Sequence, residues 1–174
     1  MALATPRDLF LHELSDTLSA ENIILGMLGE LEKETEHPDV KSAVKQHQTE
    51  TKQQIENVEK IFKQLGEKAE DVSCHAAEGL KAEHDSLKEE QPSPQVMELG
   101  NLAGAAKTEH YEIASYTSLV QMARDLGERE AVDLLSENLA QEKEMARTVE
   151  SLAKQLGKEI KAEMKEQEKE AANA

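Results

Sequence analysis

Five glutamates interrupt otherwise apolar helical patterns in this 174-residue chain. Around Glu109, for example, Ala106, Ile113 and Val120 recur at the spacings that place side chains on one face of a helix. A buried carboxylate without a partner is costly, so a glutamate on an apolar face needs a cation or a hydrogen-bond donor. Glu21 and Glu142 lie within apolar faces in the same way, and Glu50 and Glu112 lie on the flanks of such faces.

These glutamates lie at matching depths along the predicted helices. Counted from the nearest predicted turn, Glu21 and Glu50 lie about 15 and 13 residues away, and Glu112 and Glu142 both lie 15 residues away. At 1.5 Å of rise per residue, these four are level within roughly 3 Å, with Glu109 roughly 4 Å further along. Carboxylates can share one layer of a dry core if a cation lies among them, and oxygen ligands suit iron or manganese. The pattern therefore predicts two metal ions, iron or manganese.

Two histidines are predicted to supply nitrogen to this site. The carboxylate-bridged dimetal plan combines one Glu from each of two helices with a Glu-x-x-His from each of the other two. This chain departs from that plan, because Gln53 and Met145 occupy the expected histidine positions. His47, one turn before Glu50 and some 7 Å off level, and His110 are the histidines near the layer. Core packing, or a hydrogen bond to a metal ligand, is the alternative role for both.

Proline and glycine divide the chain into helical segments that could position these residues. Thr5-Pro6 and Ser93-Pro94 are typical helix starts, and Gly66 and Gly127 are typical helix ends. Each long segment is apolar at both ends and polar in its middle. We predict long helices over 6–35, 39–65, 95–126 and 129–156, with a shorter helix within 74–90.

Connection lengths predict the topology. The two shortest breaks make the first and second long helices antiparallel neighbours, and likewise the third and fourth. The 26-residue segment 67–92 is long enough to return the chain along the bundle. We therefore predict an all-α, ferritin-like four-helix bundle over residues 1–157, with one long crossover containing a short helix. An up-down array with an extra helix is the alternative, and residues 158–174 form a Lys- and Glu-rich helical or disordered tail.

Composition limits the partners. A formal net charge of −16 disfavours nucleic acids and anionic membranes and favours cations. Aromatic residues make up only 2% of the chain, so the core must be aliphatic. No run approaches the roughly 18 apolar residues of a membrane span. Since Cys74 is the single cysteine, no internal disulfide can form, and we expect a cytoplasmic protein.

Blocks of sequence along residues 5–156 resemble the YciE/YciF-like family of bacterial stress proteins. The resemblance implies a ferritin-like bundle with a short crossover helix, a homodimer and a dimetal centre, without implying an established reaction. Apolar side chains off the main seam, Leu9, Leu18 and Leu25, are further reason to expect a dimer. The blocks are DLFLHELSDTLSAE (8–21), HQTETKQQIENVEKIFKQLG (47–66), CHAAEGL (74–80), EHYEIASY (109–116) and LLSENLAQEK (134–143).

Two classes of function follow from the predicted layer. The first is a di-iron or di-manganese oxidase or peroxidase, in which the metals activate dioxygen or peroxide; the Glu109-x-x-Glu112 pair resembles the extra carboxylate of rubrerythrins, which favours peroxide. The second is a non-catalytic stress or scaffold protein whose polar layer sets helix register. Tyr116 is predicted to pack in the core or to be redox-active. Predicted hydrogen-bond partners of the site are Thr17, Thr51, Gln54 and Asn138.

Overall fold

The computed structural model describes residues 3–172, and within that range it contains five helices and no strand. The long helices are connected in the predicted order, and the predicted starts and ends are confirmed to within one residue at all but one terminus. The helices are α1 (Pro6–Glu34), α2 (Pro38–Leu65), α3 (His75–Glu89), α4 (Pro94–Leu126) and α5 (Arg129–Ala172).

Local chemistry explains where the helices begin and end. At the start of α1, the Asp8 amide donates to the Thr5 hydroxyl and the Thr5 amide donates to the Asp8 carboxylate, which is a capping box. Gly66 and Gly127 end α2 and α4 with φ of 69° and 79°, a left-handed conformation that glycine adopts without a steric penalty. The helix-breaking residues therefore act where the sequence places them.

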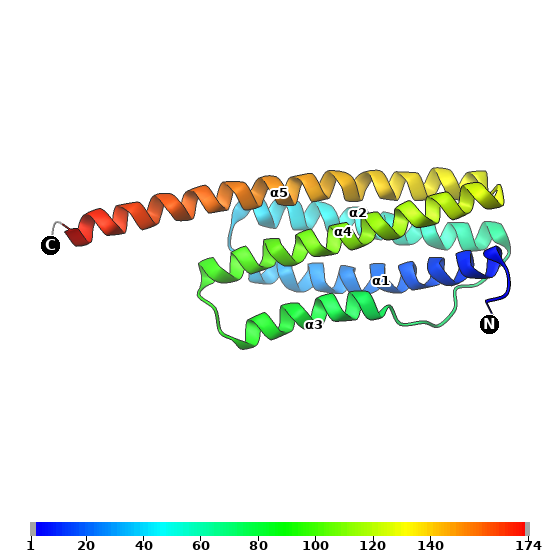
Figure 1. The fold of residues 1–174 in the computed structure, drawn as a ribbon, viewed down its shortest axis with the longest axis horizontal. Coiled ribbons are helices and arrows are strands. Elements are labelled where there is room, and N and C mark those ends of the chain that lie inside the picture. Colours follow the sequence, from blue (N-terminus) through cyan, green and yellow to red (C-terminus); the bar gives the residue numbers. More distant parts are fainter. Residues whose placement is uncertain (1–2, 173–174) are drawn as a thin grey trace.

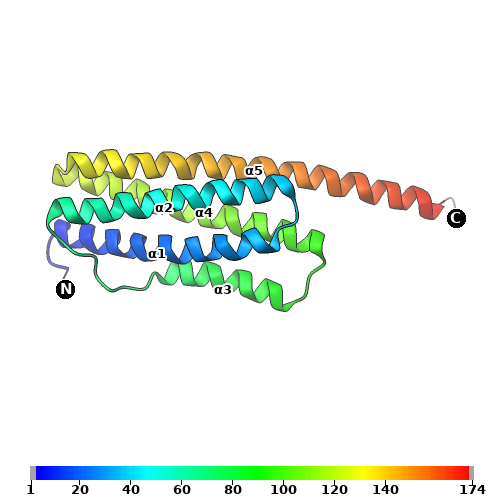
Figure 2. The ribbon, with the colours of Figure 1, turned by 180° about the vertical axis from the view of Figure 1, so that it is seen from behind.

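Helices α1, α2, α4 and α5 form the bundle, and α3 lies on its outside (Figure 1). Helix α1 is antiparallel to α2, α4 is antiparallel to α5, and the two hairpins join through contacts of α1 with α4 and of α2 with α5 (Figure 1). Helix α3 packs on α1 and α4 and returns the chain to the end where α2 began, as the view from behind also shows (Figure 2). The all-α ferritin-like fold with one long crossover is thus confirmed.

The fourth long helix was predicted to end at Leu156, with residues 158–174 as a helical or disordered tail. The helix does not stop at Leu156 but continues through Gly157 to Ala172, and its last turns extend beyond the bundle (Figures 1 and 2). A glycine inside a helix costs only about 1 kcal/mol, too little to end a helix without further breaking residues. Side-chain contacts one turn apart span this point, including Gln155 to Glu159 at 3.1 Å, and Ile160 still packs on the core.

The core consists of two apolar clusters at opposite ends of the bundle, with polar residues between them. The first cluster contains Phe10, Ile61, Leu119 and Leu135. Leu18, which was expected at the surface, packs against it. The second cluster contains aliphatic side chains from the other half of each long helix, namely Ile24, Val44, Leu102, Met145 and Val149. No helix within residues 3–172 combines the length and apolar character needed to cross a bilayer.

Candidate metal centre

The polar layer contains one compact group of four potential metal ligands. His47 from α2, Glu109 and Glu112 from α4, and Glu142 from α5 are all buried, and one ligand atom from each lies within 4.8 Å of the others. The His47 Nε2 atom is 3.3 Å from Glu109 Oε1 and 4.0 Å from Glu142 Oε2. One nitrogen and three carboxylates therefore converge from three helices on a single point.

The atoms that face this point lack hydrogen-bond partners. Neither Glu112 oxygen, nor Oε2 of Glu109 or Glu142, nor Nε2 of His47 makes a hydrogen bond within residues 3–172. Buried polar atoms in folded proteins are normally paired, because leaving one unpaired costs about 1–3 kcal/mol. A cation coordinated by these atoms would satisfy them together, so the ligand set fits a metal ion.

A fifth carboxylate, Glu21 of α1, lies beside this group and is held by hydrogen bonds. The Tyr116 hydroxyl donates to Glu21 Oε1, while Glu21 Oε2 has no partner in the described chain. Asn138 Nδ2 donates to the Tyr116 oxygen at 3.1 Å, and Asn57 Nδ2 donates to Asn138 Oδ1 at 2.8 Å. One oxygen of Glu21 is therefore fixed and the other remains available.

Burial and mutual repulsion raise the pKa values of these carboxyl groups. Desolvation, followed by the charge of Glu142, raises the pKa of Glu21 to about 8 and that of Glu109 to about 10. The same two causes raise the pKa of Glu112 well above its ordinary value. Without a cation, the layer must hold protons at neutral pH, and a metal ion would replace them.

A comparison with known families identifies the chain. A family model described as "Domain of unknown function (DUF892)" matches residues 5–164. The chain belongs to this family. It is 38% identical to Protein YciF of Escherichia coli K12 over 144 residues, which cover 82% of this chain and 87% of YciF. The sequence resemblance is thereby confirmed.

Solved structures of related proteins share the architecture. The crystal structure of the E. coli stress protein YciF matches with a TM-score of 0.86 at 35% identity, covering 90% of this chain and 99% of YciF. YcfI of Rhodopseudomonas palustris matches with a TM-score of 0.83 at 34% identity, covering 86% of this chain and 95% of YcfI. At 23% identity and a TM-score of 0.74, a protein of Xanthomonas campestris shares the fold.

Four of the seven predicted site residues form this group in the DUF892 protein, Glu21 lies beside it, and Glu50 lies outside it. Its side chain is 23% exposed, and its Oε2 is 3.9 Å from Nδ1 of His47, on the opposite side of the ring from Glu109. Proximity of His47 lowers the pKa of Glu50. Glu50 is therefore placed to orient the His47 ring, as carboxylates next to metal-bound histidines do. The four that converge are His47, Glu109, Glu112 and Glu142.

His110 does not reach the layer. Its side chain is exposed, and its Nδ1 is 2.8 Å from the carbonyl oxygen of Ala106, to which the ring N–H donates. One residue along an α-helix turns the side chain by about 100°, so the neighbour of an inward-facing Glu109 points away from the seam. Of the two predicted nitrogen donors, only His47 is in position.

Among the residues that support the site, Gln54 and Asn138 act as predicted and Asn57 was missed. Gln54 Nε2 donates to Glu142, and Asn138 bonds to Tyr116. Asn57 lies three residues after Gln54, on the same helical face, so periodicity could have revealed it. Its hydrogen bond to Asn138 connects α2 to α5.

Proposed function

We propose that this protein is a dimetal-carboxylate protein that reacts with dioxygen or peroxide in a stress-related role. The observation that carries the proposal is the group of four buried ligands whose inward-facing atoms lack partners. His47, Glu109, Glu112 and Glu142 would hold one ion. Glu21 is the carboxylate left for a second ion, with Glu112 or Glu142 available to bridge. The mixture of oxygen ligands and one imidazole suits iron or manganese.

Each surrounding residue has a definite task in this proposal. When bound, the metal ions would supply a site for the oxidant and the electrons that reduce it. Tyr116 and Gln54 fix Glu21 and Glu142 by hydrogen bonds, while Glu50 orients His47. Two apolar clusters lie above and below the layer.

Elemental analysis tests the metal part of the proposal. Protein purified without added metal should contain iron or manganese, and Glu109→Ala should remove it. The metal-free variant should be about as stable as the metal-free parent, since the cost of burying one carboxyl group is gone. Glu137→Ala, on the exposed face of α5, is the matched control and should retain the metal. Unchanged metal content in Glu109→Ala would refute the site.

A specific observation supports the alternative, a non-catalytic scaffold protein. The hydrogen bonds Asn57–Asn138–Tyr116–Glu21 join α2, α5, α4 and α1, so one network fixes the register of all four bundle helices. The related YcfI is itself described as a candidate structural protein. Metal-dependent consumption of hydrogen peroxide distinguishes the two functions, because a scaffold would bind or lack metal without consuming the oxidant.

We also propose a homodimer located in the cytoplasm. Leu9 on α1 and Val96 and Leu99 on α4 remain exposed and offer apolar surface to a second copy. The buried, free thiol of Cys74 fits a reducing compartment.

A further inference from the structure

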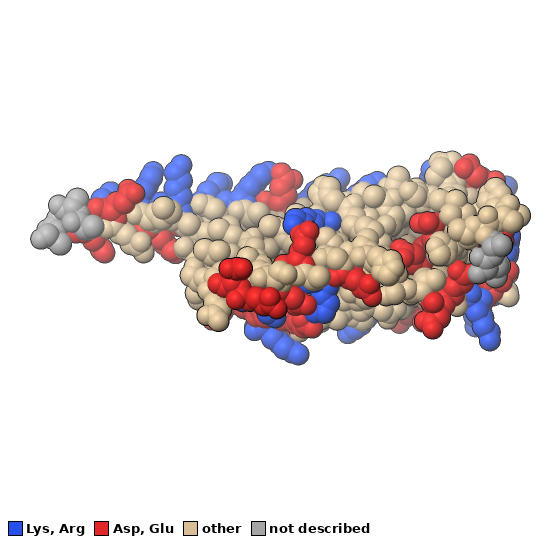
Figure 3. All heavy atoms as spheres, turned by 60° about the horizontal axis from the view of Figure 1, so that its bottom comes forward, with Lys and Arg blue, Asp and Glu red and all other residues tan. Residues whose placement is uncertain are grey.

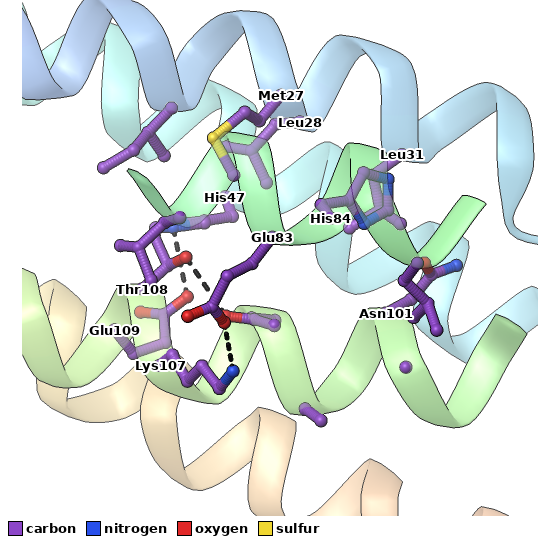
Figure 4. Close-up of a pocket in the computed structure, with 17 residues that line it drawn as sticks. Met27, Leu28, Leu31, His47, Glu83, His84, Asn101, Lys107, Thr108 and Glu109 are labelled. Carbon is purple, nitrogen blue, oxygen red and sulfur yellow. Dashed lines mark hydrogen bonds and ion pairs between the residues drawn. The ribbon is translucent and has the colours of Figure 1, made fainter. Parts of the chain in front are cut away.

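A cavity of about 290 Å³ leads from the surface to the candidate metal centre. It lies between α1, α3 and α4, and two of the candidate ligands, His47 and Glu109, line its inner end (Figure 4). The walls are mainly aliphatic, with Ile24, Leu28, Leu31, Leu80 and Leu87 among the lining residues. An apolar cavity of this size is typical of a site for a small organic molecule.

One polar side chain in the cavity has no partner. Asn101 is 2% exposed, and neither its Nδ2 nor its Oδ1 makes a hydrogen bond within residues 3–172. Figure 4 shows Asn101 at one end of the cavity and the His47–Glu109 pair at the other. A buried carboxamide with both groups unpaired is rare in folded proteins. A ligand with a group that both donates and accepts would satisfy it.

Charge selects a neutral ligand. Glu109 lies at the inner end, and the exposed Glu83 at the entrance is already paired with Lys107. Acidic side chains gather over the α3 side of the molecule, which is turned forward in Figure 3. A charged head group of either sign would lose its hydration against the aliphatic walls, and the lysine of the lining, Lys107, is already paired with Glu83.

Helix geometry sets the length of the ligand. Asn101 and Glu109 are eight residues apart on α4, which corresponds to about 12 Å along the helix axis. An extended aliphatic chain rises about 1.3 Å per bond, so the oxygen and eight carbons of a linear alcohol extend about 10 Å and fit within this distance with van der Waals contact at each end.

We propose that the cavity binds a neutral, linear aliphatic molecule of about eight carbons with one hydroxyl group, which bonds to Asn101 while the chain extends toward His47 and Glu109. Binding requires no metal. The inner end of the chain lies beside the candidate centre, so this class of molecule is also the organic substrate that could reach it.

Gly104 offers a way to block the cavity without altering a ligand. It lies on α4 between Asn101 and Glu109, and a Cβ atom built there meets no atom of the described chain within 4 Å. Gly104→Leu should fill the cavity and also favour the helix, since glycine is a poor helix former. Gly79→Leu is the matched control, because Gly79 lies on α3, outside the cavity, with equally open space.

The test is a titration of metal-free protein with 1-octanol, followed by NMR. We expect saturable shifts of the Asn101 side-chain NH₂ signals and of the backbone amides of residues 103–105, with no such response to octanoate. Gly104→Leu should abolish binding and Gly79→Leu should preserve it. Asn101→Leu should weaken octanol binding about fivefold, the loss expected for one hydrogen bond, and should leave octane binding unchanged or stronger.

Several results would overturn the proposal. Equal octanol affinity in Asn101→Leu would show that Asn101 does not hold the hydroxyl group. A second cavity of about 30 Å³ also borders Asn101 and is large enough for a water molecule. If octanol does not bind at millimolar concentration and Asn101→Leu simply raises the melting temperature, the partner of Asn101 is water only. If the purified protein holds no metal but binds octanol, this inference stands and the proposed function fails. If it holds metal but does not bind octanol, the proposed function stands and this inference fails.

Discussion

The stability of the metal-free protein should fall as pH rises from 5 to 8. The pKa of Glu21 is about 8 and that of Glu109 about 10 in the folded protein, against an ordinary value of 4.5. In this window the folded protein keeps these protons and the unfolded chain loses them. A group with a raised folded pKa contributes its full stabilisation below its unfolded pKa and loses it as pH rises through the folded pKa.

The size of the effect follows from the number of protons held. Each carboxyl group that is protonated only in the folded state lowers the free energy of unfolding by about 1.4 kcal/mol per pH unit. Over the three units from pH 5 to 8, Glu21 alone should lower the free energy of unfolding by on the order of 4 kcal/mol. This is a large part of the total free energy of unfolding of a domain, which is typically about 5–15 kcal/mol. Glu109 and Glu112 act in the same direction. Carboxylates with lowered pKa values, such as Asp8, titrate below this window.

Urea unfolding followed by circular dichroism at pH 5, 6, 7 and 8, with a chelator present, measures this dependence. Glu109→Gln mimics the protonated side chain and should reduce the slope by about 1.4 kcal/mol per pH unit. The exposed Glu137→Gln should leave the slope unchanged. Added manganese should flatten the curve, because the ion replaces the protons. If the free energy of unfolding, measured with the chelator present, is constant or rises from pH 5 to 8, the reasoning is refuted.

Two further predictions concern the surroundings of the site, and a third concerns the oligomeric state. Tyr116→Phe removes the donor to Glu21 and the acceptor for Asn138, so the free energy of unfolding should fall by about 1–3 kcal/mol in urea titrations; an unchanged value would contradict the network. Glu50→Gln should weaken metal binding about 10- to 100-fold in competition titrations by releasing the His47 ring, and complete loss of metal would instead make Glu50 a ligand. Sedimentation at micromolar concentration should give twice the chain mass of 19.3 kDa, and a monomer would count against the dimer.

The helices were predictable because their ends depend on short-range chemistry. Thr5, Ser93, Gly66 and Gly127 act within one turn of their own positions, so sequence is sufficient to identify them. The apolar–polar–apolar pattern of each seam likewise became two apolar clusters with a polar layer between them. The end of α5 was not predictable from Gly157, because a single glycine only weakens a helix and the outcome depends on its neighbours.

The position of His47 was misjudged for a geometric reason. Its offset of some 7 Å was counted against Glu21 from the turn that the first two long helices share, whereas its contact is with Glu109, whose depth was counted from the turn at the opposite end of the bundle (Figure 1). His47 is about 10 residues from the turn between α1 and α2, and Glu109 is 18 residues from the turn after α4. Because α2 is 28 residues long, these two positions are level. Glu50 has a suitable depth but lies on the flank of its helical stripe, and the face that a residue occupies decides whether it reaches the centre.

The unequal pairing within the polar layer favours metal binding over a purely structural role. Tyr116, Asn138 and Asn57 are paired with one another, as buried groups that fix helix register should be. His47 and Glu112, in the same layer, are equally buried and leave all their side-chain nitrogen and oxygen atoms without hydrogen bonds in the described chain. A layer that served only register would have no reason to retain them, since apolar residues of similar size would avoid the cost of burying unpaired groups. The paired half can hold the helices in place, and the unpaired half is the part that a bound cation would satisfy.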